Sequence, residues 1–142
     1  MNTLHRFYIA SKVGLAEPEV DRLSDVLVGR GYINMYDWTQ SIVDKPFRDH
    51  ATEAHEAAEC MLNAVKHCDI IIVLVKDKGL GLHIETGGAL VAGMIWQDVM
   101  GQKRKRILIV GEDSERSVFY FHKSVERFQT VADALLTLPA LV

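Results

Sequence analysis

The sequence predicts a three-layer α/β domain, in which helices cover both faces of a doubly wound parallel sheet of about five strands. Short apolar runs alternate with helical patterns along the 142 residues, and this alternation is typical of right-handed βαβ units. The run at positions 70–75 is apolar throughout, as expected for a central strand covered on both faces. No repeat, linker or low-complexity tract divides the chain. Residues 1–142 are therefore expected to form one domain with a flavodoxin-like strand order.

The N-terminal half is predicted to contain two strands and two helices. Phe7–Ala10 is a short β-prone run, and a helix follows from Pro18, at a position where the missing N–H costs nothing. Ile33–Trp38 is a second strand candidate, and the polar stretch 39–50 after it is long enough to suggest a functional loop. Helical spacing then predicts an amphipathic helix. Its apolar face comprises Ala54, Ala57, Ala58, Met61 and Val65, and its other faces carry Glu53, Glu56, Asn63 and Lys66.

The C-terminal half begins with the buried strand at 70–75 and a glycine-bearing loop at 76–82. The helix expected over about 84–100 is apolar nearly all round, so it should be buried or packed against a partner chain. A fourth strand follows at Ile107–Val110, and Thr130 with Asp133 predicts a capping box for a last helix. Further extended chain is expected from Val118–Phe121 and Arg127-Phe128.

Composition argues against several classes of protein. The 16 Lys and Arg residues against 19 Asp and Glu give a net charge of -3, which is unlike a dedicated binder of nucleic acid or anionic membranes. Cys60 and Cys68 are too few for a disulfide framework or a zinc cage, and His55 lacks the second histidine of a zinc-protease helix. No apolar run reaches the roughly 20 residues of a membrane span. We therefore expect a cytoplasmic protein without a metal site.

Polar residues gather at the predicted carboxyl edge of the sheet, where α/β folds bind ligands. Gly79 and Gly81 let the backbone approach a ligand there, although a dinucleotide-binding loop would need a third glycine in place of Ile84. Glu85 falls in or near the first turn of the next helix. A catalytic role and a favourable interaction with the helix dipole are both open for it. The other residues at this edge are Ser11, Asp37, Trp38 and Asp77.

The segment Gly79–Gly87 resembles the glycine-rich, glutamate-bearing motif of the nucleoside 2-deoxyribosyltransferase superfamily, which includes the nucleoside 5′-monophosphate N-glycosidases. The resemblance covers the chain from about Arg6 to Leu138 and implies an enzyme that acts on a small nucleoside or nucleotide without a cofactor. Three further segments match in the same order: Phe7-Tyr8-Ile9-Ala10-Ser11, Cys68-Asp69-Ile70-Ile71-Ile72-Val73 and Ser124-Val125-Glu126-Arg127-Phe128.

The resemblance implies roles for individual residues. Glu85 would attack the anomeric carbon of the sugar and displace the base, and the resulting glycosyl-enzyme ester would pass to water or to another base. Tyr8 would orient this carboxylate or contact the sugar, whereas its sequence pattern alone indicates a buried core aromatic. Gly79 and Gly81 would shape the loop beside the sugar.

The sequence departs from the family at one position. Family members carry a second acid, which helps to hold the base or its proton, eight residues before the aspartate that matches Asp69; here that residue is Met61. Either Asp37 or Asp77 then holds the base or its proton in place of this acid, or the enzymatic activity is altered or absent. A non-catalytic nucleotide or ADP-ribose-like binding module is therefore the alternative interpretation.

Four other positions each have two interpretations. Ser11 begins a strand-to-helix turn that is either an anion site or an ordinary turn. Asp37 and Trp38 either bind a base or belong to the loop, with the tryptophan as its anchor. His83 either adjusts the reactivity of Glu85 or only forms a hydrogen bond with the backbone where the helix begins.

The resemblance also implies an oligomer. In some family members a neighbouring subunit completes the pocket from the segment after the fourth strand, where Ser117 and Phe119 stand. The glycine-studded helix that follows Glu85 would pack against this neighbour. We therefore expect a homodimer or a higher homo-oligomer.

Overall fold

The computed structural model describes residues 5–12, 17–75, 80–103 and 105–141, and five strands within these ranges form one sheet. All five run parallel in the order β2-β1-β3-β4-β5. This order confirms the predicted flavodoxin-like, doubly wound sheet. The strands are β1 (Arg6–Ala10), β2 (Ile33–Asn34), β3 (Ile70–Leu74), β4 (Arg106–Val110) and β5 (Val125–Phe128).

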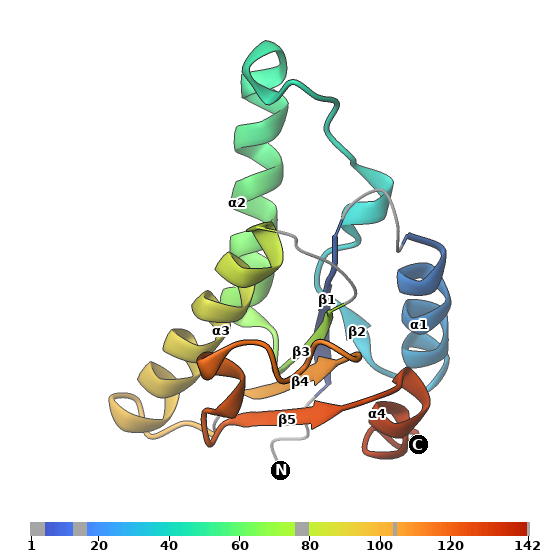
Figure 1. The fold of residues 1–142 in the computed structure, drawn as a ribbon, viewed down its shortest axis with the longest axis vertical. Coiled ribbons are helices and arrows are strands. Elements are labelled where there is room, and N and C mark those ends of the chain that lie inside the picture. Colours follow the sequence, from blue (N-terminus) through green and yellow to red (C-terminus); the bar gives the residue numbers. More distant parts are fainter. Residues whose placement is uncertain (1–4, 13–16, 76–79, 104, 142) are drawn as a thin grey trace.

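Helices cover the sheet in two layers, with α2 and α3 on one side and α1 and α4 on the other (Figure 1). Figure 1 also shows that the N-terminal half of α2 rises well past the sheet. Within the described ranges, no helix combines the length and the hydropathy that a membrane span requires. The helices are α1 (Glu17–Gly29), α2 (Ala51–His67), α3 (Leu80–Asp98) and α4 (Val131–Leu136).

The core lies along the three middle strands, because their continuous apolar runs have no side that faces solvent. Ile70–Leu74 is buried at every position, as are Phe7–Ala10 and Ile107–Val110 on its two neighbours. The last helix begins as predicted. Thr130 Oγ1 accepts a hydrogen bond from the Asp133 amide at 3.1 Å and donates one to the Asp133 carboxylate at 2.8 Å.

Two segments predicted to be extended are short 3-10 helices. The second strand ends at Asn34, because Asp37 caps the helix η1 (Trp38–Gln40). The segment Val118–Phe121 forms a second such helix, η3, in which the Ser117 hydroxyl accepts a hydrogen bond from a backbone amide. In both places a side-chain cap stabilises a local turn that competes with the strand suggested by the sequence pattern.

Helix α3 also differs from its prediction, because it begins at Leu80 rather than Ile84. Gly81 is therefore part of the helix instead of the loop before it. Glu85 consequently lies in the second turn. The predicted loop residues Asp77 and Gly79 lie outside the described residues.

Candidate active site

The structure brings together Tyr8 and Glu85, the two residues that the sequence comparison assigned to catalysis. Tyr8 stands in the middle of β1 and is 0% exposed, and Glu85 is a partly buried residue of α3. Helix α3 packs against β1. Because successive strand residues point to opposite faces, Tyr8 can face this helix while Phe7 and Ile9 face the other layer.

Each of these two side chains keeps a buried polar atom without a hydrogen-bond partner. Within the described part of the chain, neither Tyr8 Oη nor Glu85 Oε2 has one. The Tyr8 hydroxyl is close enough to influence the pKa of Glu85, although the two groups do not meet the geometry of a full hydrogen bond. An unpaired buried polar group costs about 1–3 kcal/mol. Such a pair is therefore expected where a bound ligand supplies the missing partners.

Burial dominates the electrostatics of the pair. It raises the pKa of Glu85 from 4.5 to about 7, and the Tyr8 hydroxyl partly opposes this shift by favouring the carboxylate. Burial also raises the pKa of Tyr8, and the negative charge of Glu85 raises it further. Tyr8 therefore stays protonated, while Glu85 changes charge near neutral pH. Glu85 lies in the second turn of α3, beyond the first turn, where the helix dipole acts most strongly on a carboxylate.

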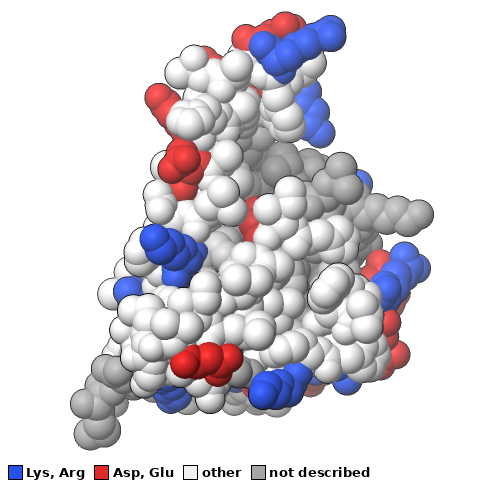
Figure 2. Space-filling view, turned by 90° about the vertical axis from the view of Figure 1, so that its left-hand side faces the viewer, with Lys and Arg blue, Asp and Glu red and all other residues white. Residues whose placement is uncertain are grey.

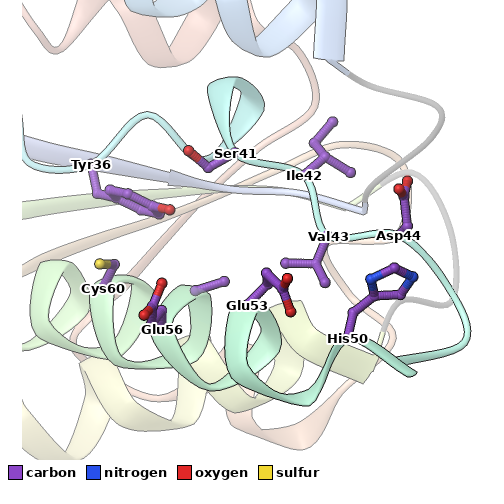
Figure 3. A pocket seen from close by; sticks show the side chains of 10 residues that line it. Tyr36, Ser41, Ile42, Val43, Asp44, His50, Glu53, Glu56 and Cys60 are labelled. Carbon is purple, nitrogen blue, oxygen red and sulfur yellow. The ribbon is translucent and has the colours of Figure 1, made fainter. Parts of the chain in front are cut away.

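A pocket of about 500 Å³ lies between α2 and the segment that leads into it through the 3-10 helix η2 (Phe47–His50) (Figure 3). Tyr36 lines this pocket and also lies close enough to raise the pKa of Tyr8, so it connects the pocket to the pair. In Figure 3, Tyr36 stands across the pocket from Glu56 and Cys60 of α2. The other lining residues are Ser41, Ile42, Val43, Asp44, His50, Glu53 and Ala57.

Sequence reasoning missed this pocket. The helical pattern assigns Glu53 and Glu56 to polar faces of α2, and both are exposed, but the preceding segment folds back beside them. Their spacing with Cys60, at i, i+3 and i+7, was a signal that they share one helix face, next to a long loop of a kind that is often functional. Met61, which stands where the family that the sequence resembles has a second acid, packs half-buried against the core.

Asp37 and Trp38 have partners within the protein. Asp37 Oδ1 accepts hydrogen bonds from the Thr39 amide at 3.2 Å and the Thr39 hydroxyl at 2.6 Å. Trp38 is buried, and its indole Nε1 donates to the Ile9 carbonyl at 2.7 Å, which anchors η1 against β1. Ser11 lies half-buried directly after β1. Substrate contacts by these residues stay predictions.

A second group of predicted residues lies elsewhere on α3. His83, Ser117 and Phe119 line a pocket of about 300 Å³, in which His83 Nδ1 lies 3.2 Å from the Tyr120 hydroxyl. Two residues turn a helix by about 200°, so His83 and Glu85 point to different sides of α3. The predicted site residues therefore form two groups. The remaining residues of this pocket are Thr86, Gly87 and Leu90.

Comparison with known proteins identifies solved structures that share this fold. No family model matches the sequence, and no curated protein matches it significantly. The solved structure of CMP N-glycosidase BcmB from Clostridium botulinum is 18% identical with a TM-score of 0.55, and the match covers 93% of this chain and 96% of that chain. A 2-deoxyribosyltransferase from Bacillus psychrosaccharolyticus is 16% identical with a TM-score of 0.60, over 95% of this chain and 96% of that chain. These likenesses confirm the fold that the sequence resemblance implied.

Proposed function

We propose that the protein cleaves or transfers the N-glycosidic bond of a nucleoside or nucleoside 5′-monophosphate. The observation that carries this proposal is the buried pair Tyr8 and Glu85, which has unpartnered oxygens and a carboxyl pKa of about 7. Above this pKa Glu85 is ionised and can act as a nucleophile, and the buried oxygens without partners are where a ligand would make contact. Two solved structures of the same fold, a CMP N-glycosidase and a 2-deoxyribosyltransferase, support an enzyme of this class.

In the proposed reaction, the Glu85 carboxylate attacks the anomeric carbon of the sugar. A carbon–oxygen bond forms as the bond to the base nitrogen breaks, and the electron pair of that bond leaves with the base, which takes up a proton. Water then attacks the glycosyl ester and loses a proton to yield the free sugar, or a second base attacks through a ring nitrogen and loses the proton of that nitrogen to yield a new nucleoside. Either route returns the Glu85 carboxylate.

Tyr8 acts as a positioning residue in this scheme. Its raised pKa keeps the hydroxyl protonated, so it can donate a hydrogen bond to Glu85 or to the sugar. By favouring the carboxylate form it also increases the fraction of Glu85 that can react. We assign the sugar to the space beside this pair and beside Gly79 and Gly81, and a 5′-phosphate to the turn at Ser11.

We assign the exposed side of α3 to contact with a second copy of the chain. Ile84, Val91 and Ile95 recur on one helical face and are all exposed, and Figure 2 shows few charged side chains over the centre of this side of the molecule. Large exposed apolar surfaces mark interaction sites. Ser117 and Phe119 line the neighbouring pocket. This arrangement supports their proposed contribution to a neighbouring subunit's site.

A substrate panel tests the proposed activity. The protein is incubated with nucleosides and their 5′-monophosphates, with and without an acceptor base, and free base is measured by chromatography. Base release that is lost in Glu85→Gln supports the enzyme, and a glycosylated acceptor identifies a transferase rather than a hydrolase. Tight binding without base release from any substrate would instead establish a non-catalytic binding module.

A further inference from the structure

We propose that the pocket between α2 and the segment 41–50 holds the nucleobase and selects bases that carry an exocyclic amino group, with Glu56 as the selecting residue. The inference rests on the proposed function, because it assigns one part of the substrate to one part of that site. It names the class of substrate: nucleosides of the cytosine and adenine type in preference to those of the uracil and hypoxanthine type.

The charge of the lining decides which part of a nucleoside fits this pocket. Asp44, Glu53 and Glu56 contribute three carboxyl groups, His50 is present as well, and no Lys or Arg is found among the described lining residues. A phosphate group would be repelled there. No group of three or more possible metal ligands is found within the described ranges, so these carboxyl groups are not gathered as a cation site. The electrically neutral base is the part of the substrate that fits.

The geometry of α2 and α3 determines where this pocket lies relative to Glu85. A Cβ atom built at Gly88 of α3 would lie 3.5 Å from Val65 of α2, so these two residues mark the same level of the two helices. Both helices run away from the carboxyl edge of the sheet (Figure 1). Counted from this level, Glu85 lies about 4.5 Å outward along α3 and Glu56 about 13.5 Å outward along α2. A sugar at Glu85 would extend its base outward toward Glu56.

Tyr36 lies close both to the pocket and to the pair Tyr8 and Glu85. Its ring lies across the pocket from Glu56 (Figure 3), and it influences the pKa of Tyr8, whose buried hydroxyl has no partner among the described residues. The unpartnered oxygens of Tyr8 and Glu85 indicate a ligand beside this pair, and this observation is independent of the acidic lining of the pocket. A base between Tyr36 and α2 would lie between an aromatic ring and a carboxylate.

The chemistry of a carboxylate then gives the selectivity. An ionised carboxylate only accepts hydrogen bonds. Cytosine and adenine each present an amino group that donates, whereas uracil and hypoxanthine present a carbonyl oxygen in the same place. With its oxygen directed at this exocyclic position rather than at the neighbouring ring nitrogen, Glu56 would stabilise the first pair and repel the second. Replacement by glutamine supplies both a donor and an acceptor, so the preference should disappear or reverse.

Matched substrates test this selectivity. We expect kcat/KM to be at least about tenfold higher for cytidine than for uridine, and for adenosine than for inosine, in ribo- or deoxyribo-form. In Glu56→Gln the ratio should fall to about one or below, with a gain for uridine. In Glu56→Ala it should fall without reversing. Glu59→Gln, an exposed change on the same helix outside the pocket lining, should leave the ratio unchanged.

Calorimetric binding of cytidine and uridine to Glu85→Gln, which is not expected to turn over, separates this inference from the proposed activity. We expect Glu85→Gln to bind cytidine in preference to uridine, and the double variant Glu85→Gln/Glu56→Gln to lose this preference. That result supports the assignment of the base to the pocket even where the wild-type protein releases no base. Equal binding of the two nucleosides, or a preference that survives the Glu56 change, overturns it. Base release without such a preference would overturn this inference and retain the proposed activity.

Discussion

The Tyr8 hydroxyl of β1 and the Glu85 carboxyl of α3 lie next to each other, and each keeps one buried oxygen without a partner among the described residues. Their mutual influence has opposite consequences for the two groups. The hydroxyl makes Glu85 easier to ionise, while the carboxylate makes Tyr8 harder to ionise. The pair is thus set up as one donor and one carboxylate near neutral pH, and the central claim of this account is that the carboxylate is a nucleophile.

Removal of the Tyr8 hydroxyl should change activity more than stability. Tyr8→Phe deletes a buried group that has no hydrogen-bond partner in the described chain, so the free energy of unfolding should stay equal or rise by up to about 1 kcal/mol. Base release should fall by about 10- to 100-fold. Because the hydroxyl lowers the pKa of Glu85, the pH–rate profile should move to higher pH. A slower variant with an unchanged profile would contradict the proposed coupling.

The pH dependence of activity should report the Glu85 pKa of about 7. The reactive form is the carboxylate, so kcat/KM should rise with pH and reach a plateau above neutrality. One pH unit below this pKa, the rate should be about tenfold lower than the plateau. The measurement is a pH–rate profile of base release under subsaturating substrate. A rate that is flat between pH 5 and pH 8, to within about a factor of two, would exclude Glu85 as the group that must ionise.

Stability should show the opposite trend. The folded-state pKa of Glu85 lies above its ordinary value of 4.5, so the folded protein binds this proton more tightly than the unfolded chain does. The resulting stabilisation is complete at low pH and is lost as pH rises through about 7. At pH 8, Glu85→Gln should therefore be more stable than wild type by about 1–3 kcal/mol, measured by urea unfolding. The difference should vanish near pH 4, and equal stability at both pH values would show that Glu85 is not desolvated.

Gly111 is required by the backbone where the chain leaves β4. Its φ is +134°, and a Cβ atom there would lie 2.4 Å from the Val75 carbonyl oxygen. Gly111→Ala should lower the free energy of unfolding by about 3 kcal/mol or more. Gly29→Ala is the matched control, because Gly29 ends α1 with open space around it. That change should be neutral or stabilise by up to about 1 kcal/mol, and similar losses for both variants would refute the steric argument.

The exposed face of α3 should hold two copies together. Val91 is 58% exposed on this face, and Val28 is 53% exposed on α1, on the other side of the sheet. Val91→Glu should convert a dimer into a monomer in sedimentation velocity, whereas Val28→Glu should not. If Ser117 and Phe119 complete a neighbour's site, Val91→Glu should also lose activity. A wild-type monomer at all concentrations would contradict the assignment.

Local sequence patterns account for most of the fold. The apolar run of β3 identifies the central strand, and Thr130 identifies the start of α4, because both depend on neighbouring residues alone. Two of the errors arise where a cap competes with a strand pattern. Asp37 and Ser117 each stabilise a 3-10 turn within β-prone sequence, and a pattern of apolar residues does not reveal which of the two conformations wins.

Less of the candidate site than of the fold could be predicted from the sequence. Tyr8 and Glu85 were identified by their resemblance to a family motif, whereas the pattern alone predicted a core aromatic for Tyr8, which is indeed fully buried. The role of Glu56 depends on where the segment 41–50 returns to α2. That contact is determined by the tertiary structure, and helical spacing shows only which residues share a face.

The most direct test of the central claim is to trap the glycosyl ester. A 2′-fluoro nucleoside analogue, whose fluorine slows hydrolysis of the ester, is incubated with the protein, and the acid-quenched protein is examined by intact-mass spectrometry and peptide mapping. The account predicts a mass increase equal to the bound sugar, located on the peptide that contains Glu85 and absent from Glu85→Gln. Release of base from ordinary nucleosides at an undiminished rate by Glu85→Gln, with no adduct on the wild-type protein, would contradict it.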